Sequence, residues 1–421
     1  MPEVVKLDRN RIRDLFDLRR RGEGNAPLYE DDPYPGLHRL RAEAPVHAGT
    51  VHELLGHQME GGFQGLPEPD RPHFSAFSYA ACSEAFRDDG LFTSSPVEVV
   101  GDEVTGLNSS MLYMNGPRHR RYRSLVQPSF VPAQAKWWIE NWINVTVNTL
   151  IDGFEADGRA ELNVDFDAAI PMLTITGSFG IDVDDALDIR AALARSQGGE
   201  AREGSATMYR ILMPIIAARR EKPEDDLISV LCQAEMTDDE GVHRLDDQQI
   251  FAFSYLLLAA GSGTTWKQLG ITLTALLTHP EFLASIREDR SLLRPAVEES
   301  LRWAPTDPTF ARYVARDTEF YGLDVPAGAV MHMCLGAANR DPQRWVQPDE
   351  YDITRQVLPS LAFGSGPHIC LGMHVARAEI TTAISALLDR LPNLRLDPDA
   401  EPPRFVGMYE RGPTEIPVLW G

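Results

Sequence analysis

Apolar residues recur every three or four positions through the middle of the chain and again near its C-terminal end. This spacing places apolar side chains on one face of an α-helix. It predicts helices at 137–154, 172–181, 186–196, 206–221 and 227–234, and a further helix at 371–391. The pattern at 246–278 is longer and predicts a helix of roughly 45 Å at ~1.5 Å per residue.

Elsewhere apolar and polar residues alternate, which is typical of strands. Alternating stretches at 312–316, 318–325 and 330–335, with a Pro-Ala-Gly turn at 326–328, predict a small sheet with hairpins. The whole pattern predicts a mostly α protein with smaller β-sheets, an α+β fold. Its helical core covers 115–305 and 371–391, and its β-rich parts are 44–80, 312–335 and 391–421.

Composition narrows the classes of protein that this pattern allows. Hydrophobic residues make up 43% and charged residues 24% of the chain, which is ordinary for a globular protein. A net charge of −22 disfavours nucleic acid and anionic membranes as general partners. No apolar run reaches the roughly 20 residues that span a bilayer, and residues 1–21 are charged throughout. We therefore expect a soluble, cytoplasmic protein.

Cys370 is the first candidate for chemistry, because it lies where a glycine-rich loop meets the predicted helix at 371–391. Unpaired N–H groups and the helix dipole favour a thiolate at such a position. This suits a metal ligand or a nucleophile. A nucleophile would need a base such as His368 or His374, but no strand and oxyanion-hole pattern precedes them. Structural zinc would need further nearby thiolates.

The glycines around Cys370 would let the backbone approach a broad, flat ligand. The order of Phe363, Gly364, Gly366, His368, Cys370 and Gly372 resembles the haem-binding loop of cytochrome P450 enzymes. The resemblance implies that Cys370 is the thiolate ligand of haem iron, that Phe363 shields its sulfur, and that His368 reaches a haem propionate. Gly364 and Gly372 belong to the same loop.

A second signature lies at 115–126. Asn115 is a plausible N-cap with Pro117 in the first turn, and His119 and Arg123 lie four apart on one helical face. The segment resembles the family's propionate-binding helix, and Arg312 matches another propionate-binding position. The family usually has Asp-Pro-Pro at this helix start, whereas this chain has Asn-Gly-Pro. A solvated basic face is the alternative explanation.

The centre of the 246–278 helix contains Gly261 and Gly263, each costing about 1 kcal/mol relative to alanine. Close packing against another helix could explain them. The segment also resembles the family's oxygen-binding motif, in which Ala260 lies against haem and Thr264, followed by Thr265, helps deliver protons. The family usually has an acid where this chain has Gly263. That departure requires a water-filled route or another proton donor, or it favours peroxide-driven chemistry.

Further positions follow from the same resemblance. Glu299 and Arg302 form the family's Glu-x-x-Arg pair, which Arg355 would join to lock the haem-side core. A loop at 94–112 would roof the substrate pocket. Tyr409 and Glu410 would lie at a hairpin tip near the substrate, with solvent-facing turn positions as the alternative. The expected pocket residues are Val97, Val100, Leu256, Ala259, Ala260, Pro308, Thr309, Phe310, Tyr409 and Glu410.

The resemblance covers nearly the whole chain and implies one domain over 1–421, with haem b between the long helix and the Cys370 loop. It implies a monomeric monooxygenase that inserts one oxygen atom of O2 into a small hydrophobic substrate, of the terpenoid or aromatic class. Electrons would come from NAD(P)H through a reductase and a [2Fe–2S] ferredoxin, which would meet the basic cluster of Arg118, Arg120 and Arg121. The alternatives are other haem-thiolate chemistry and a non-catalytic haem sensor.

Overall fold

The computed structural model describes residues 9–16, 29, 32–57, 70–95, 110–197, 201–238 and 241–421. Val97 and Val100, with most of the loop expected at 94–112, lie outside the described residues.

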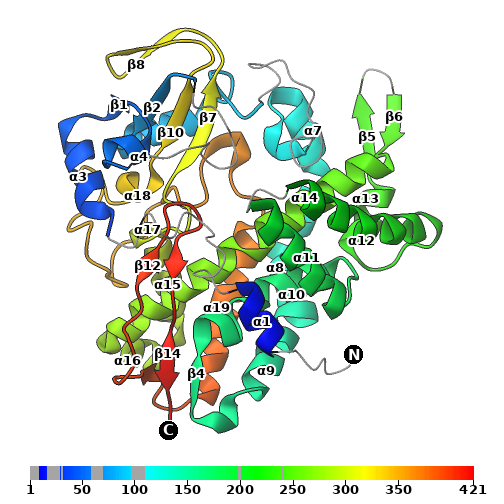
Figure 1. Cartoon of the computed structure of the whole chain (residues 1–421), viewed down its shortest axis with the longest axis vertical. Helices are drawn as coiled ribbons and strands as arrows, with labels where there is room; N and C mark the ends of the chain where they lie inside the picture. The colour runs from blue at the N-terminus through cyan, green and yellow to red at the C-terminus, as the bar shows by residue number, and fades with distance from the viewer. Residues whose placement is uncertain are drawn as a thin grey trace.

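One long helical axis runs through the middle of the molecule (Figure 1). It consists of α14 (Asp247–Ser262) and α15 (Thr264–Thr278), which meet at Gly263. Asp246 begins it with a capping box, in which its carboxylate accepts from the N–H of Gln249. The long helix predicted at 246–278 is therefore present, with its interruption at one of its two central glycines.

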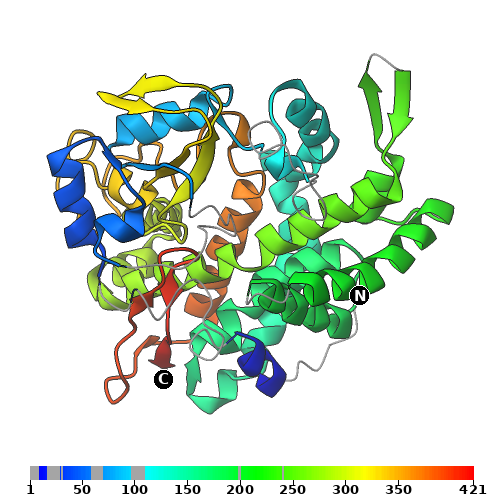
Figure 2. The ribbon, with the colours of Figure 1, turned by 45° about the horizontal axis from the view of Figure 1, so that its top comes forward.

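Other helices pack around this axis. α10, α12 and α13 pack against α14, and α11 packs on α10 and α12, whereas α17 and α19 pack against α15 (Figure 2). Most predicted helices are confirmed. The observed bounds are α7 (Gly116–Val126), α8 (Ala135–Trp138), α9 (Asn144–Asp152), α10 (Ala169–Ser178), α11 (Val183–Gln197), α12 (Ala201–Glu221), α13 (Leu227–Gln233), α16 (Pro280–Glu288), α17 (Leu293–Trp303) and α19 (Met373–Arg390).

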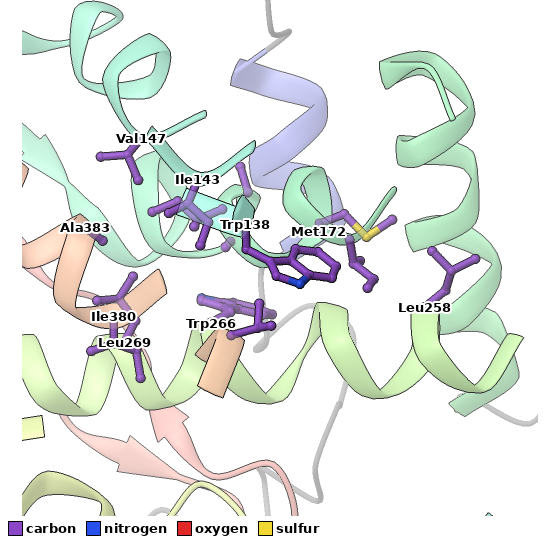
Figure 3. Close-up of a cluster of buried hydrophobic side chains, with 14 of the residues drawn as sticks. Trp138, Ile143, Val147, Met172, Leu258, Trp266, Leu269, Ile380 and Ala383 are labelled. Atoms are coloured by element: carbon purple, nitrogen blue, oxygen red, sulfur yellow. The ribbon is translucent and has the colours of Figure 1, made fainter. Parts of the chain in front are cut away.

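The core lies between α15 and α19 on one side and helices that include α9 and α10 on the other (Figure 3). Trp266 on α15 is fully buried, and its indole N–H lies 2.9 Å from the carbonyl oxygen of Asn163. Such a partner removes the cost of burying the polar end of the ring. The cluster also contains Trp138, Ile143, Val147, Met172, Leu258, Leu269, Ile380 and Ala383.

A five-stranded sheet lies beside this helical part, in the order β1-β2-β10-β7-β3. β10 and β2 are parallel, and the other neighbours are antiparallel. The β-rich parts expected at 44–80 and 312–335 supply most of its strands. Its strands are β1 (Val46–Ala48), β2 (His73–Ala76), β3 (Phe92–Thr93), β7 (Phe310–Val314) and β10 (Val330–Met333), with α3 (Tyr34–Glu43), α4 (Val51–Leu54), α5 (Tyr79–Arg87) and α18 (Leu335–Ala338) nearby.

Short strands complete the fold. The β12 (Phe405–Val406) and β13 (Gly412–Pro413) hairpin lies against α15. β4 (Arg159–Glu161) joins β14 (Pro417–Leu419), far away in sequence, and this strand was not predicted because so short a stretch has no clear alternation. The remaining elements include α1 (Arg9–Phe16), β11 (Arg395–Leu396), the β5 (Glu235–Asp238) and β6 (Gly241–Arg244) hairpin, and β8 (Thr318–Phe320) with β9 (Leu323–Val325).

Within the part of the chain that the structure describes, no single helix has both the length and the apolar character needed to cross a bilayer. The Asp247–Thr278 axis and α16 pass that test only as a pair, which is bent by 100°.

A buried ionic cluster joins α17 to the segment before the Cys370 loop. Arg302 donates from Nε and Nη2 to the two carboxylate oxygens of Glu299, at 2.8 and 2.7 Å. Arg355 donates to the same carboxylate at 3.1 Å. The remaining Arg302 donors reach backbone carbonyls, including that of Pro348 at 2.7 Å. The structure thus brings together the three residues that the resemblance had grouped.

We predict that Glu299→Gln lowers the free energy of unfolding by about 3–5 kcal/mol, because it leaves two arginines without their buried counterion. Glu43→Gln is the matched control, since Glu43 forms an exposed pair with Arg39 and should cost at most about 1 kcal/mol. Urea unfolding followed by circular dichroism measures both. Equal losses in the two variants would contradict this role of Glu299.

Candidate active site

The Cys370 loop is held by backbone contacts that need its glycines. Gly366 has φ +74°, and a Cβ there would lie 2.5 Å from the carbonyl oxygen of Phe86. Gly364 has φ +69°, and its N–H closes a turn onto Leu361 at 2.8 Å. From the sequence, these glycines were expected to let a broad ligand approach the backbone. For Gly366 the reason is different, because protein backbone occupies the space that a side chain would need.

The sulfur of Cys370 is the accessible thiol of the described chain, since the other three cysteines are buried. Desolvation by the surrounding protein raises the pKa of this thiol, and an N–H donated by Gly372 acts in the opposite direction. The positive charge of Arg123 also favours the thiolate. A bound cation would add the stabilisation that the thiolate still needs. The helix α19 begins at Met373, so Cys370 precedes its first turn rather than starting it.

Basic side chains gather close to this loop. The rings of His119 and His368 stack with centroids 3.8 Å apart. Burial lowers the pKa of His119 to about 4 and that of His368 to about 2, with repulsion from nearby arginines contributing. Burial also lowers the pKa of Arg312 to about 10. His119 Nδ1 is buried without a hydrogen-bond partner among the described residues.

This cluster fits an anionic group. Burial and mutual repulsion disfavour the charged forms of its members, and the carboxylate whose charge acts on both His119 and Arg312 is Asp89. A ligand with carboxylates would supply counterions and accept from the unpartnered His119 nitrogen. The donor set therefore fits the propionates of a haem whose iron Cys370 would bind.

Asn115 occupies the N-cap position of α7 but does not cap it, which corrects the sequence-based assignment. Its side chain instead bonds Thr93, accepts from the N–H of Ser94 at 3.3 Å, and pairs with His368 Nε2 at 3.2 Å. The residue therefore links α7, the segment after β3 and the Cys370 loop.

Phe363 packs at the edge of the helical core. The guanidinium of Arg377 lies 4.6 Å from its ring centroid, and Arg377 pairs with Glu298. The ring is thus fixed by a cation from α19. Its expected shielding of the sulfur stays a prediction.

The two glycines near the break in the central helix, Gly261 and Gly263, have different neighbours. A Cβ on Gly261 would lie 3.2 Å from the Ile175 side chain, so helix packing explains this glycine. A Cβ on Gly263 would lie 3.2 and 3.3 Å from the two carboxylate oxygens of Glu410. Thr264 is half-buried, and its hydroxyl donates to the carbonyl of Ala260 at 3.1 Å.

Thr265 on α15 is buried, and its hydroxyl acts to lower the pKa of Glu379 on α19. Its assignment as a catalytic residue stays a prediction. Burial raises the pKa of Glu379 to about 8, so this carboxyl is mostly protonated at neutral pH. Thr265 therefore links α15 to α19.

The expected pocket residues fall into different environments. Ala260 is exposed and Ala259 half-buried, Leu256 and Pro308 are buried, and Phe310 and Tyr409 are half-buried. Thr309 is fully buried, with its hydroxyl donating to the carbonyl of Met408 at 3.3 Å. Their assignment to a substrate pocket stays a prediction.

Glu410 lies at the tip of the β12–β13 hairpin, but not as a solvent-facing turn residue. Its carboxylate is buried and accepts from Lys267 Nζ at 2.5 Å. Its backbone N–H donates to Asp307 Oδ1 at 3.0 Å. Lys267 and Asp307 were not predicted as site residues. A lysine between Trp266 and Leu269, in a helix that is otherwise uncharged, was the available signal for a buried charge.

Fold and site together define a helical protein that offers one accessible cysteine sulfur and a buried basic cluster to a broad, dianionic cofactor. The family model described as Cytochrome P450 matches residues 208–408. The monooxygenase PikC of Streptomyces venezuelae is 31% identical over 92% of this chain and 91% of its own. The vitamin D(3) 25-hydroxylase of Pseudonocardia autotrophica is 32% identical, over 93% and 94%. The chain belongs to the cytochrome P450 family, and it is a haem-dependent monooxygenase that uses O2.

Solved structures agree with this assignment. P450BioI, in complex with an acyl carrier protein that carries hexadec-9Z-enoic acid, superposes with a TM-score of 0.80 at 28% identity and covers 93% of this chain and 99% of its own. CYP267B1, in complex with myristic acid, gives 0.79 at 29% identity and covers 97% and 99%. The architecture is therefore the cytochrome P450 fold, as the sequence predicted.

We predict that Arg312→Gln weakens haem binding by about 10- to 100-fold, because a charge-assisted hydrogen bond contributes about 1.5–3 kcal/mol. Arg316→Gln is the control, since Arg316 is exposed just beyond the same strand. Transfer of haem to apomyoglobin measures its retention. Identical transfer rates in both variants would rule out a propionate contact by Arg312.

Proposed function

We propose that this enzyme inserts one oxygen atom of O2 into a small, largely apolar molecule of the terpenoid or aromatic class. The observation that supports the proposal is the gathering of the His119–His368–Arg312 cluster and Arg123 around the Cys370 loop, from separate elements. Bound haem supplies the iron chemistry that activates O2, and the thiolate increases electron density at that iron.

The protein's own residues divide the remaining tasks. The haem propionates are held by four side chains, which fix the cofactor's orientation: His119, Arg123, Arg312 and His368. Thr264 holds a proton at Oγ1 beside the opening of the helix. Accessible Ala259 and Ala260 leave room on that face for an apolar molecule.

The relatives support an apolar substrate without identifying it. One is named a vitamin D(3) 25-hydroxylase, and one similar structure contains myristic acid. A panel of terpenoids, aromatics, fatty acids and vitamin D3 therefore forms the first screen. Binding is followed by the spin-state change in the absorption spectrum, and turnover by product analysis with NADPH, ferredoxin, reductase and O2. Turnover with hydrogen peroxide alone, and none with ferredoxin, would favour the peroxide-driven alternative.

The electron donor is proposed to be an acidic [2Fe–2S] ferredoxin with a separate NAD(P)H-dependent reductase, in the cytoplasm, acting on a monomeric enzyme. Arg118, Arg120 and Arg121 are exposed on α7, whereas His119 on the same helix is buried. The helix that carries the proposed propionate ligand therefore also presents a basic surface, which shortens the path between partner and cofactor. Arg118 and Arg121 line a surface cavity of about 300 Å³.

We predict that Thr264→Ala lowers the amount of product formed per NADPH at least several-fold and raises hydrogen peroxide release, because the alanine cannot hold the proton. Thr264→Ser keeps a hydroxyl and should retain most of the coupling. Parallel measurement of NADPH, product and peroxide checks this. Unaltered coupling in the alanine variant would remove Thr264 from the mechanism.

We predict that Arg121→Glu slows reduction by ferredoxin about tenfold at low salt and weakens the dependence of this rate on ionic strength, because it reverses a charge in the docking surface. Arg395→Glu is the control, since Arg395 is exposed on β11, away from α7. Stopped-flow reduction over a range of salt concentrations measures both. The same salt dependence in variant and wild type would place the ferredoxin elsewhere.

A further inference from the structure

The Glu410 carboxylate, from the β12–β13 hairpin, lies beside position 263, where the family usually carries an acid on the central helix. Both carboxylate oxygens of Glu410 lie within 3.3 Å of the position that a Cβ on Gly263 would take. Residue 263 is the last position before the Thr264 helix, and Lys267 lies one turn further along the same face. Glycine at 263 thus creates the space in which the Glu410 carboxylate lies.

Several contacts hold this carboxylate in place. Glu410 has φ +49°, a left-handed conformation that costs free energy in a residue other than glycine. The hairpin tip is fixed through Thr306, whose hydroxyl donates to the carbonyl of Arg411 at 2.9 Å and whose carbonyl accepts from the N–H of Arg411. Asp307 accepts the N–H of Glu410 itself. The surrounding structure therefore imposes this position on Glu410.

Three titratable side chains, Lys267, Glu410 and Asp307, lie close together in this cluster. Lys267 and Glu410 have side chains that are 1% and 7% exposed, and Asp307 is packed beside them. Burial and the charge of Glu410 raise the pKa of Asp307 to about 7, against the opposing effect of Lys267. Glu410 is thus paired with Lys267, whereas the neighbouring Asp307 carboxyl is partly protonated at neutral pH. Among nearby groups, Tyr409 has its pKa raised by burial and by both acids, and Arg411 donates to the carbonyl of Gly407.

We propose that Glu410, together with Asp307 and Lys267, supplies the carboxyl that relays protons to Thr264 in place of the acid missing at position 263. The inference rests on the proposed monooxygenase function and identifies its proton source. A carboxyl of the pair gives its proton toward the Thr264 hydroxyl, directly or through one water, and the resulting carboxylate regains a proton from solvent. The ion pair with Lys267 stabilises the carboxylate form of Glu410. Glu410 is therefore a relay residue that acts through Thr264.

The alternative is that the Lys267–Glu410 pair only anchors the hairpin to α15. An anchor and a proton source can be distinguished by moving the carboxylate from position 410 on the hairpin to position 263 on the helix. Glu410→Ala removes the carboxyl and makes room at position 263, and the double variant Gly263→Asp/Glu410→Ala restores a carboxylate one helical turn from Lys267. An anchor at the hairpin tip would not be restored by that exchange, whereas a proton source would be.

The test uses the haem-loaded enzyme with ferredoxin, reductase and NADPH, and myristic acid and the spin-shifting hits of the screen as probes. Glu410→Ala and Glu410→Gln should each lower the product formed per NADPH at least tenfold, increase peroxide release and enlarge the solvent deuterium isotope effect. The double variant should recover at least half of the lost coupling. Glu410→Asp, which keeps the carboxyl, should be intermediate.

A readout independent of turnover is the carboxyl ¹³C signal of labelled Asp and Glu in the reduced, carbon-monoxide-bound protein. A resonance should titrate near pH 7, disappear in Asp307→Asn, and shift its midpoint downward in Glu410→Gln, because the neighbouring negative charge is removed. Unchanged coupling and isotope effect in Glu410→Gln would overturn the relay. So would a loss that the double variant does not restore. A wild-type enzyme without any product would instead contradict the proposed function, while the ¹³C titration would still report on the cluster.

Discussion

The structure depends on keeping the Cys370 sulfur and several cationic side chains together at one site, where the surrounding protein disfavours their charged forms. The Cys370 thiol, His119, His368 and Arg312 all have pKa values moved toward their neutral forms by burial. Such an arrangement is unfavourable by itself, and a bound metal complex with two carboxylates relieves both parts of it. The cofactor is therefore a structural partner of the fold as well as its reagent.

Rigid supports keep these groups in place from several directions. Gly366 lets the Cys370 loop lie against the backbone of Phe86, and Asn115 ties the same loop to α7. Behind the loop, the Glu299 carboxylate joins two arginines. The central helix is interrupted at Gly263, and the Glu410 carboxylate of the β12–β13 hairpin lies beside this glycine. Each functional group thus comes from a different element, and the ionic contacts between elements set their relative positions.

The sequence predicted much of this arrangement because the relevant signals are local. The helix periods, the loop order from Phe363 to Gly372 and the spacing of Glu299 and Arg302 can each be read within a short window. The Lys267–Glu410–Asp307 cluster could not be predicted in this way, because its residues are far apart in sequence and Glu410 resembles an ordinary turn residue. The role of Asn115 was misjudged for the same reason: its side chain bonds distant elements instead of its own helix.

The most direct test of the account is the absorption spectrum of the reduced, carbon-monoxide-treated protein with and without the Cys370 sulfur. The account predicts the red-shifted Soret band of a thiolate-ligated haem in the wild type. It also predicts that Cys370→Ser loses this band while the Glu299–Arg302–Arg355 cluster keeps the chain folded. A wild-type protein that binds no haem, or a serine variant that keeps the band, would contradict it.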